Sequence, residues 1–218
     1  KTPNKIALHK SLDTHIVCTN HYQSDLFLHD KYNCSNIANS DSQYRFHRMD
    51  ELLTEHYPIS TSDAVVILRN RFGISDTDIG LCNEKSINQF IAHHSVVFLP
   101  SERKMWVSTA PWQLGEFICY DLKKIFDNSM PPLAYMSSDE LNIEADSSAI
   151  CNDCVCVYHY RQQYKAITTA IAHKRKLDKE IIDDFIACNP NYYRVYDTIG
   201  DYYLDVCNNR SQAEKYWH

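Results

Sequence analysis

Glycine and proline are scarce in this chain of 218 residues, with four and seven copies respectively. The glycines form neither a G-x-G-x-x-G fingerprint nor a Walker loop. No apolar run approaches the roughly 20 residues that a bilayer span requires. Lysine and arginine are spread along a chain of net charge −6 instead of forming a basic stripe. These absences argue against hydride and phosphoryl transfer, against a membrane span, and against nucleic acid as a partner.

Cysteine is present in nine copies, an odd number that a fully paired disulfide framework cannot use. The only cluster with metal-like spacing is Cys151-x-x-Cys154-x-Cys156, which would need His159 as a fourth zinc ligand. Valines alternate with the last two cysteines, a pattern that favours a strand with Cys154 and Cys156 on one face. The cluster therefore indicates core or disulfide cysteines, and we expect no metal and no cofactor.

The first two thirds of the sequence predict a mixture of strands and helices, so the fold class is α+β. Continuous apolar runs in the middle of the chain suit strands that are covered on both faces, as in a sheet-on-sheet sandwich. A polar stretch without period, 24–42, predicts a long loop. The expected strands are 5–9, 14–19, 90–99, 105–108 and 116–122, and the expected helices are 42–56 and 62–72.

From about Ser148 onward the sequence becomes helical. Apolar residues at helical spacing predict helices over 158–174 and 177–188. The following tyrosine-rich stretch, 192–217, resembles one tetratricopeptide-like helix pair, and a single pair cannot form a solenoid. We therefore divide the chain into a sandwich portion, 1–147, and a helical extension, 148–218, that packs on it.

The stretch Val17-Cys18-Thr19-Asn20-His21-Tyr22 places an asparagine just after an apolar run. A carboxamide held at a strand end by rigid neighbours can direct its N–H groups at developing negative charge, as acyl-transfer chemistry requires. A turn or capping asparagine is the alternative. We expect a buried or half-buried Asn20 that faces His93 or His94.

The order of the motifs resembles that of the penicillin acyltransferase family, autoproteolytic N-terminal-nucleophile (Ntn) hydrolases related to the choloylglycine hydrolases. The resemblance covers about Lys5 to Leu122 and matches the C-terminal half of such enzymes. It is carried by 19–22 (TNHY), 44–53 (YRFHRMDELL), 81–83 (LCN), the expected hairpin 95–108, and 110–112 (APW).

The resemblance implies a four-layer αββα sandwich and a nucleophilic cysteine that becomes the N-terminal residue after self-cleavage, so that its own amine acts as base. This chain begins Lys1-Thr2-Pro3, and the expected nucleophile is not in it. We therefore expect an N-terminal half of the same precursor as the partner, and we expect this chain alone to be inactive. Cys18 is the rival nucleophile near Asn20.

The remaining candidate site residues are predicted to bind substrate. In the related enzymes a basic residue lines the site where this chain carries His93 and His94. Arg45 and Arg48 lie on one helix and are the alternatives, because a guanidinium can hold a carboxylate in a bidentate pair. Trp112 follows Pro111 in a connecting loop and either walls a substrate pocket or packs at the core edge.

Two functions remain open at this point. The first is the C-terminal portion of a cysteine Ntn-type amide hydrolase or acyltransferase that acts on a small acyl amide. The second is a non-catalytic binding or protein-interaction module. The compartment stays open as well: a secreted or periplasmic location would follow if the N-terminal half carries a signal sequence.

Overall fold

The computed structural model describes residues 6–10, 14–127 and 139–217. The start of the first expected strand, Lys5, and the N-terminal Lys1-Thr2-Pro3 lie outside the described residues. The elements, in chain order, are α1 (Asp25–Leu28), α2 (Lys31–Asn39), α3 (Ser42–Glu55), α4 (Thr61–Arg69), the 3-10 turn η1 (Ile74–Asp76), β1 (Val96–Leu99), β2 (Lys104–Ser108), β3 (Phe117–Asp121), α5 (Leu122–Ile125), the 3-10 turn η2 (Asp139–Leu141), α6 (Ser147–Ala172), α7 (Lys179–Cys188), α8 (Tyr193–Asp205) and α9 (Arg210–Tyr216).

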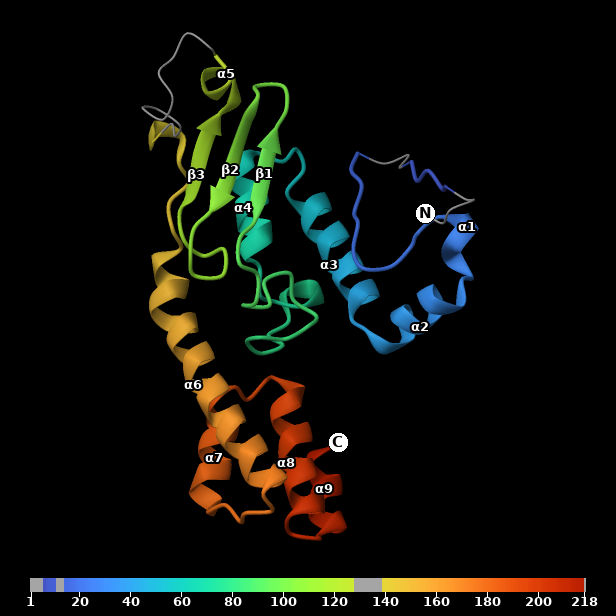
Figure 1. Cartoon of the computed structure of the whole chain (residues 1–218), viewed down its shortest axis with the longest axis vertical. Helices are drawn as coiled ribbons and strands as arrows, with labels where there is room; N and C mark the ends of the chain where they lie inside the picture. The colour runs from blue at the N-terminus through green and yellow to red at the C-terminus, as the bar shows by residue number, and fades with distance from the viewer. Residues whose placement is uncertain (1–5, 11–13, 128–138, 218) are drawn as a thin grey trace.

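The three strands form one antiparallel sheet in the order β1-β2-β3 (Figure 1). Val97 pairs with Trp106, and Trp106 pairs with Cys119, so these three side chains share one face. Helix α4 lies behind the strands in Figure 1 and places Val65 in the same core cluster. This face of the sheet is closed.

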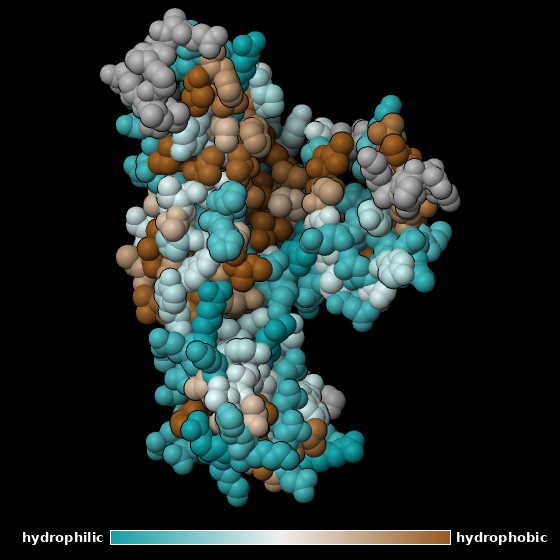
Figure 2. All heavy atoms as spheres, viewed as in Figure 1, coloured by the Kyte–Doolittle hydropathy of each residue, from teal (hydrophilic) through white to brown (hydrophobic). Residues whose placement is uncertain are grey.

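The opposite face of the sheet is also apolar, but it is not enclosed. Its two cross-strand rows are Phe98–Met105–Tyr120 and Val96–Val107–Ile118. All six side chains are partly or largely exposed, and Phe98 keeps 61% of its surface. Figure 2, which has the viewpoint of Figure 1, shows hydrophobic residues gathered over this part of the molecule. The six residues are called the outer sheet face below.

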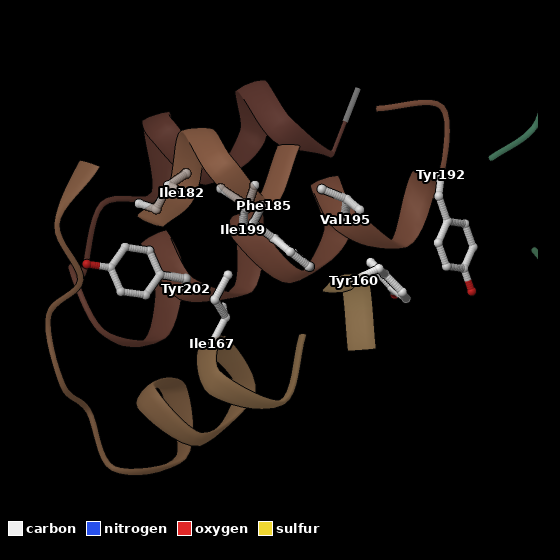
Figure 3. Close-up of a cluster of buried hydrophobic side chains, with 8 residues drawn as sticks. All are labelled: Tyr160, Ile167, Ile182, Phe185, Tyr192, Val195, Ile199 and Tyr202. Carbon is white, nitrogen blue, oxygen red and sulfur yellow. The ribbon is translucent and has the colours of Figure 1, made fainter. Parts of the chain in front are cut away.

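Helix α6 connects the sheet region to a separate helical cluster. Asp146 caps it by accepting a hydrogen bond from the Ala149 N–H at 2.9 Å. Near its start, Cys154 and Val157 pack with Phe90 and Leu114. Its second half contributes Tyr160 and Ile167 to the helical cluster of Figure 3. The other members of this cluster are Ile182, Phe185, Tyr192, Val195, Ile199 and Tyr202.

The helical part is also joined to the loop 80–90 by polar contacts. Asn189 exchanges two hydrogen bonds with the backbone of Leu81, at 3.0 and 2.9 Å. Arg161 donates to the Phe90 carbonyl at 2.6 Å. Gly80 has a φ of +78°, and a Cβ there would lie 2.6 Å from the Tyr192 nitrogen. A side chain at position 80 is therefore excluded twice, by conformation and by space.

Several sequence predictions agree with these elements. The helices expected at 42–56, 62–72, 158–174 and 177–188 correspond to α3, α4, α6 and α7, and the last two strands correspond to β2 and β3. Helix α4 begins one residue earlier than expected, at Thr61, because Ser60 caps it and forms a capping box with Asp63.

Several predicted elements are wrong. Residues 6–9 of the first expected strand form no strand. The run 14–19 is not a strand, because it pairs with no strand among the described residues, and only Val17 of its apolar residues is buried. The expected loop 24–42 contains α1 and α2, since Asp30 caps α2 with its carboxylate. Residues 90–95 precede β1 without joining it.

The cysteine cluster 151–156 is helical and not a strand. Cys154 is buried, whereas Cys151 and Cys156 are exposed. In a helix at about 100° per residue, Cys154 and Cys156 point in nearly opposite directions. The buried residues Cys154, Val157 and Tyr160 have helical spacing, and this period overrides the strand preference of the valines. The described residues thus form an α+β structure with one sheet, whereas a four-layer sandwich has two.

Candidate functional site

Asn20 is exposed, so the expectation that it would be buried is wrong. Its side-chain Oδ1 accepts a hydrogen bond from Arg45 Nη2 at 2.9 Å. Its backbone carbonyl accepts one from Asn36 Nδ2 at 2.6 Å. A guanidinium only donates, so the carboxamide oxygen must face Arg45 and the NH₂ group must point away. Among the described residues this NH₂ group has no hydrogen-bond partner.

The segment that carries Asn20 is attached to the first turn of α3. His21 Nδ1 lies 3.0 Å from Thr19 Oγ1 and 2.9 Å from the hydroxyl of the buried Ser42. Burial, and then the charge of nearby His47, lower the pKa of His21. A neutral imidazole is therefore favoured here, and it links the segment to α3.

Arg45 is held on both sides of its guanidinium. Besides the contact with Asn20, its Nη1 donates to the Glu84 carbonyl at 2.5 Å. Arg45 therefore connects Asn20 to the loop 80–90. A role of Arg45 in substrate binding stays a prediction.

Glu84 is a residue that sequence reasoning missed. Its carboxylate accepts hydrogen bonds from the hydroxyls of Tyr192 at 2.9 Å and Tyr193 at 3.2 Å, and it pairs with Arg194. Contact with this carboxylate and burial both raise the pKa of Tyr192, burial being the larger cause. No local motif marks Glu84, because its partners lie more than 100 residues away in sequence.

His93 and His94 are both exposed and precede β1. The expected strand 90–99 therefore does not include them, because β1 begins only at Val96. No hydrogen bond or ion pair joins either histidine to Asn20 in the described part of the chain.

Trp112 packs at a junction of aromatic side chains. Its ring lies 5.8 Å from Phe90 and 5.1 Å from Tyr158, with the Arg161 guanidinium 4.8 Å from its centroid. These contacts connect the loop after β2 to α6. Of the two roles that the sequence left open for Trp112, these contacts fit packing at the edge of the core.

Arg48, the other candidate guanidinium, is completely buried. It donates to Glu51 at 2.6 Å and to Asp76. A guanidinium in such a network is unavailable to a substrate, so Arg48 has a structural role.

All nine cysteines are free thiols. Burial raises the pKa of four of them, to about 11 for Cys82 and Cys188, and also upward for Cys119 and Cys154. An activated nucleophile requires the opposite shift. The exposed Cys18 has one weak contact, at 3.8 Å to the Thr19 carbonyl.

Within the described ranges, no group of three or more histidine, cysteine or acidic side chains is placed to hold a metal ion. A zinc site at 151–159 is accordingly not formed there. The same ranges contain no helix that is both long and apolar enough to cross a bilayer.

Comparison with known proteins extends this picture. Searches of curated proteins and of solved structures found no significant match. A family model described as acyl-coenzyme A:6-aminopenicillanic acid acyl-transferase matches residues 1–111. The match includes Asn20, Arg45, Glu84 and β1, and it covers half of the chain. The chain therefore belongs to the acyl-coenzyme A:6-aminopenicillanic acid acyl-transferase family.

Proposed function

We propose that this chain is the C-terminal portion of a cysteine Ntn-type acyltransferase or amide hydrolase that acts on a small acyl amide. Residues 1–147 supply the site, and residues 148–218 pack on them as a helical extension. The observation that carries the proposal is the Arg45–Asn20 hydrogen bond, because it leaves the NH₂ group of Asn20 free and oriented within the region matched to the family.

Asn20 is assigned the role of oxyanion donor. When a thiolate attacks an acyl carbonyl, negative charge develops on the carbonyl oxygen, and a fixed N–H group stabilises it. Arg45 fixes the carboxamide and adds positive charge beside it. The exposure of Asn20 in this chain fits a site that another segment completes.

The nucleophilic cysteine is assigned to a segment outside these 218 residues. The buried thiols are disfavoured as thiolates, and the amine of Cys18 is part of a peptide bond, so it cannot act as the base of an N-terminal nucleophile. Thiolate formation and general-base catalysis therefore need a contribution that this chain does not supply.

The outer sheet face supports the same assignment. Strands that are apolar on both faces are typical of sheets covered on both sides. A second sheet packed on Phe98, Met105 and Tyr120 would complete a sandwich. It would also border His93 and His94, which precede β1, and so bring them near substrate.

The test is acyl-amide turnover by a precursor in which this chain follows the cysteine-bearing segment. Asn20→Asp keeps an oxygen for Arg45 but removes the free NH₂ group and places a negative charge where the oxyanion forms. We expect kcat to fall by about 10²–10³-fold with unchanged thermal stability. Asn39→Asp, at an exposed position on α2, is the control and should retain full activity.

Two results would contradict the proposal. One is an Asn20→Asp variant with normal kcat. The other is amide hydrolysis by residues 1–218 alone that is lost when Cys18 is alkylated. Either would leave the binding-module function as the better account of the chain.

A further inference from the structure

A cleft of about 450 Å³ lies between the end of α4 and the first two turns of α6. It is far in sequence from Asn20, and neither Asn20 nor Arg45 lines it. Its volume falls within the range of about 300–1,000 Å³ that is typical of small-molecule sites. Part of its wall is apolar, formed by Val66, Phe72 and Leu114.

Two guanidinium groups line the cleft. Arg69 donates from Nε and Nη2 to three backbone carbonyls, of Gln113, Gly115 and Glu144. It forms no ion pair with a carboxylate within the described residues, and its Nη1 is free there. Arg71 uses Nε to approach Asp153, which leaves its Nη1 and Nη2 free in the same part of the structure. The cleft therefore offers donors that suit a carboxylate.

Two carboxylates line the same cleft. Asp153 is 8% exposed, and its Oδ2 lies 2.9 Å from Arg71 Nε without hydrogen-bond geometry. Its other oxygen accepts no hydrogen bond from the described residues. Burial raises the pKa of this carboxyl group, an effect that Arg71 opposes. Asp146 uses only one oxygen for its capping contact with Ala149. Asp153, a buried carboxylate that is incompletely satisfied, suits a cationic donor.

We propose that this cleft binds a free amino acid with an apolar side chain. The carboxylate of the amino acid accepts hydrogen bonds from Arg71 and Arg69, and its ammonium group donates to Asp153. The side chain lies against Phe72 and Leu114. Equal numbers of cationic and anionic groups favour a zwitterion over a simple anion or a simple amine. This site does not depend on the proposed acyl-transfer function.

The test compares three probes that share the 2-methylpropyl group of leucine, by calorimetric titration of the chain. L-leucine carries both charged groups, 4-methylpentanoate lacks the amine, and 3-methylbutylamine lacks the carboxylate. We expect leucine to bind at least about tenfold more tightly than either analogue, because each analogue leaves one charged pair of the cleft unmatched.

Two variants locate the binding. Val66→Trp fills the cleft from an exposed position and should abolish the leucine signal. Val155→Trp, at an equally exposed position on α6 outside the cleft, should leave it unchanged. Arg71→Gln should weaken leucine binding without weakening 3-methylbutylamine binding, because it removes a carboxylate donor and also a cation that competes for Asp153.

Four results would overturn the proposal. The first is that leucine fails to bind, and the second is that its binding survives Val66→Trp. The third and fourth are that leucine binds no more tightly than 4-methylpentanoate, or no more tightly than 3-methylbutylamine. Equal binding of leucine and 4-methylpentanoate would show a simple anion site. Because the readout is binding and not turnover, failure of this proposal is distinguishable from failure of the acyl-transfer proposal.

Discussion

The ion pairs of the buried Arg48 allow a quantitative prediction. Arg48 is completely buried, and its charge is balanced by Glu51 at 2.6 Å and by Asp76. Glu51 also accepts a hydrogen bond from the Ser75 N–H at 2.9 Å, which attaches η1 to α3. Glu51→Gln retains the shape of the side chain and removes its charge. The substitution therefore leaves a buried cation with one anionic partner in place of two.

The expected loss of stability follows from these contacts. A hydrogen bond to a charged group contributes about 1.5–3 kcal/mol, and complete loss of one partner of a buried pair costs about 3–5 kcal/mol. Asp76 still pairs with Arg48 in the variant, and glutamine can still accept from Ser75. We therefore expect a loss of about 2 kcal/mol, which corresponds to a Tm lower by roughly 4–8 °C in a domain of this size.

Urea unfolding followed by circular dichroism measures the change, with Glu55→Gln as the control. Glu55 lies on the same helix, is exposed, and makes no ion pair among the described residues. The reasoning is refuted if the two variants are equally stable to within about 0.5 kcal/mol, the usual range of surface substitutions.

The same network predicts a pH dependence. The hydrogen bond from Arg48 holds the pKa of Glu51 below its usual value. A carboxyl group whose pKa is lower in the folded than in the unfolded state stabilises the fold at pH values above its unfolded-state pKa. This stabilisation is lost as the pH falls through the folded-state pKa. The difference between the natural chain and Glu51→Gln should therefore be largest near neutral pH and shrink in acid. A difference that grows in acid would contradict this assignment.

Three further predictions concern the junction between the two parts of the chain. Gly80→Ala should lower stability by more than about 1 kcal/mol in urea unfolding, because alanine is strained at positive φ and its Cβ meets Tyr192; a stabilised variant would contradict this. Tyr192→Phe should cost about 0.5–1.5 kcal/mol by the same measurement, since it removes one hydrogen bond to Glu84, and a neutral effect would show that this bond contributes nothing. Truncation after Ala149 should cause aggregation in light scattering, because it uncovers the apolar residues beneath α6; a soluble product with unchanged Tm would refute the packing argument.

Much of the secondary structure could be predicted from the sequence, because local periods decide it. The apolar spacing within 42–56 and 158–174 indicated α3 and most of α6, and continuous apolar runs in the middle of the chain indicated β2 and β3. The family resemblance was also present in the order of short motifs from Asn20 to Trp112, and the family match over residues 1–111 confirms it.

The errors arose where a missing strand partner, a helix cap or a helical period outweighs the pattern that the sequence suggested. Residues 14–19 have strand composition, but a strand needs a neighbour for its backbone hydrogen bonds, and among the described residues none lies beside them. The polar stretch 24–42 contains a helix because the Asp30 carboxylate satisfies the free N–H groups at its start. Cys154 lies in a helix because its buried neighbours Val157 and Tyr160 follow helical spacing.

The site was only partly accessible from sequence. Asn20 and Arg45 could be proposed as candidates from residue type, but which way the carboxamide faces was decided by the geometry of the guanidinium beside it. Glu84 and the cleft between α4 and α6 could not be found, since their partners lie far apart along the chain. Sequence alone determined the local elements and the family, because periodicity and motif order are properties of neighbouring residues. Tertiary structure decided which charges meet, because that depends on how helices and loops distant in sequence are brought together.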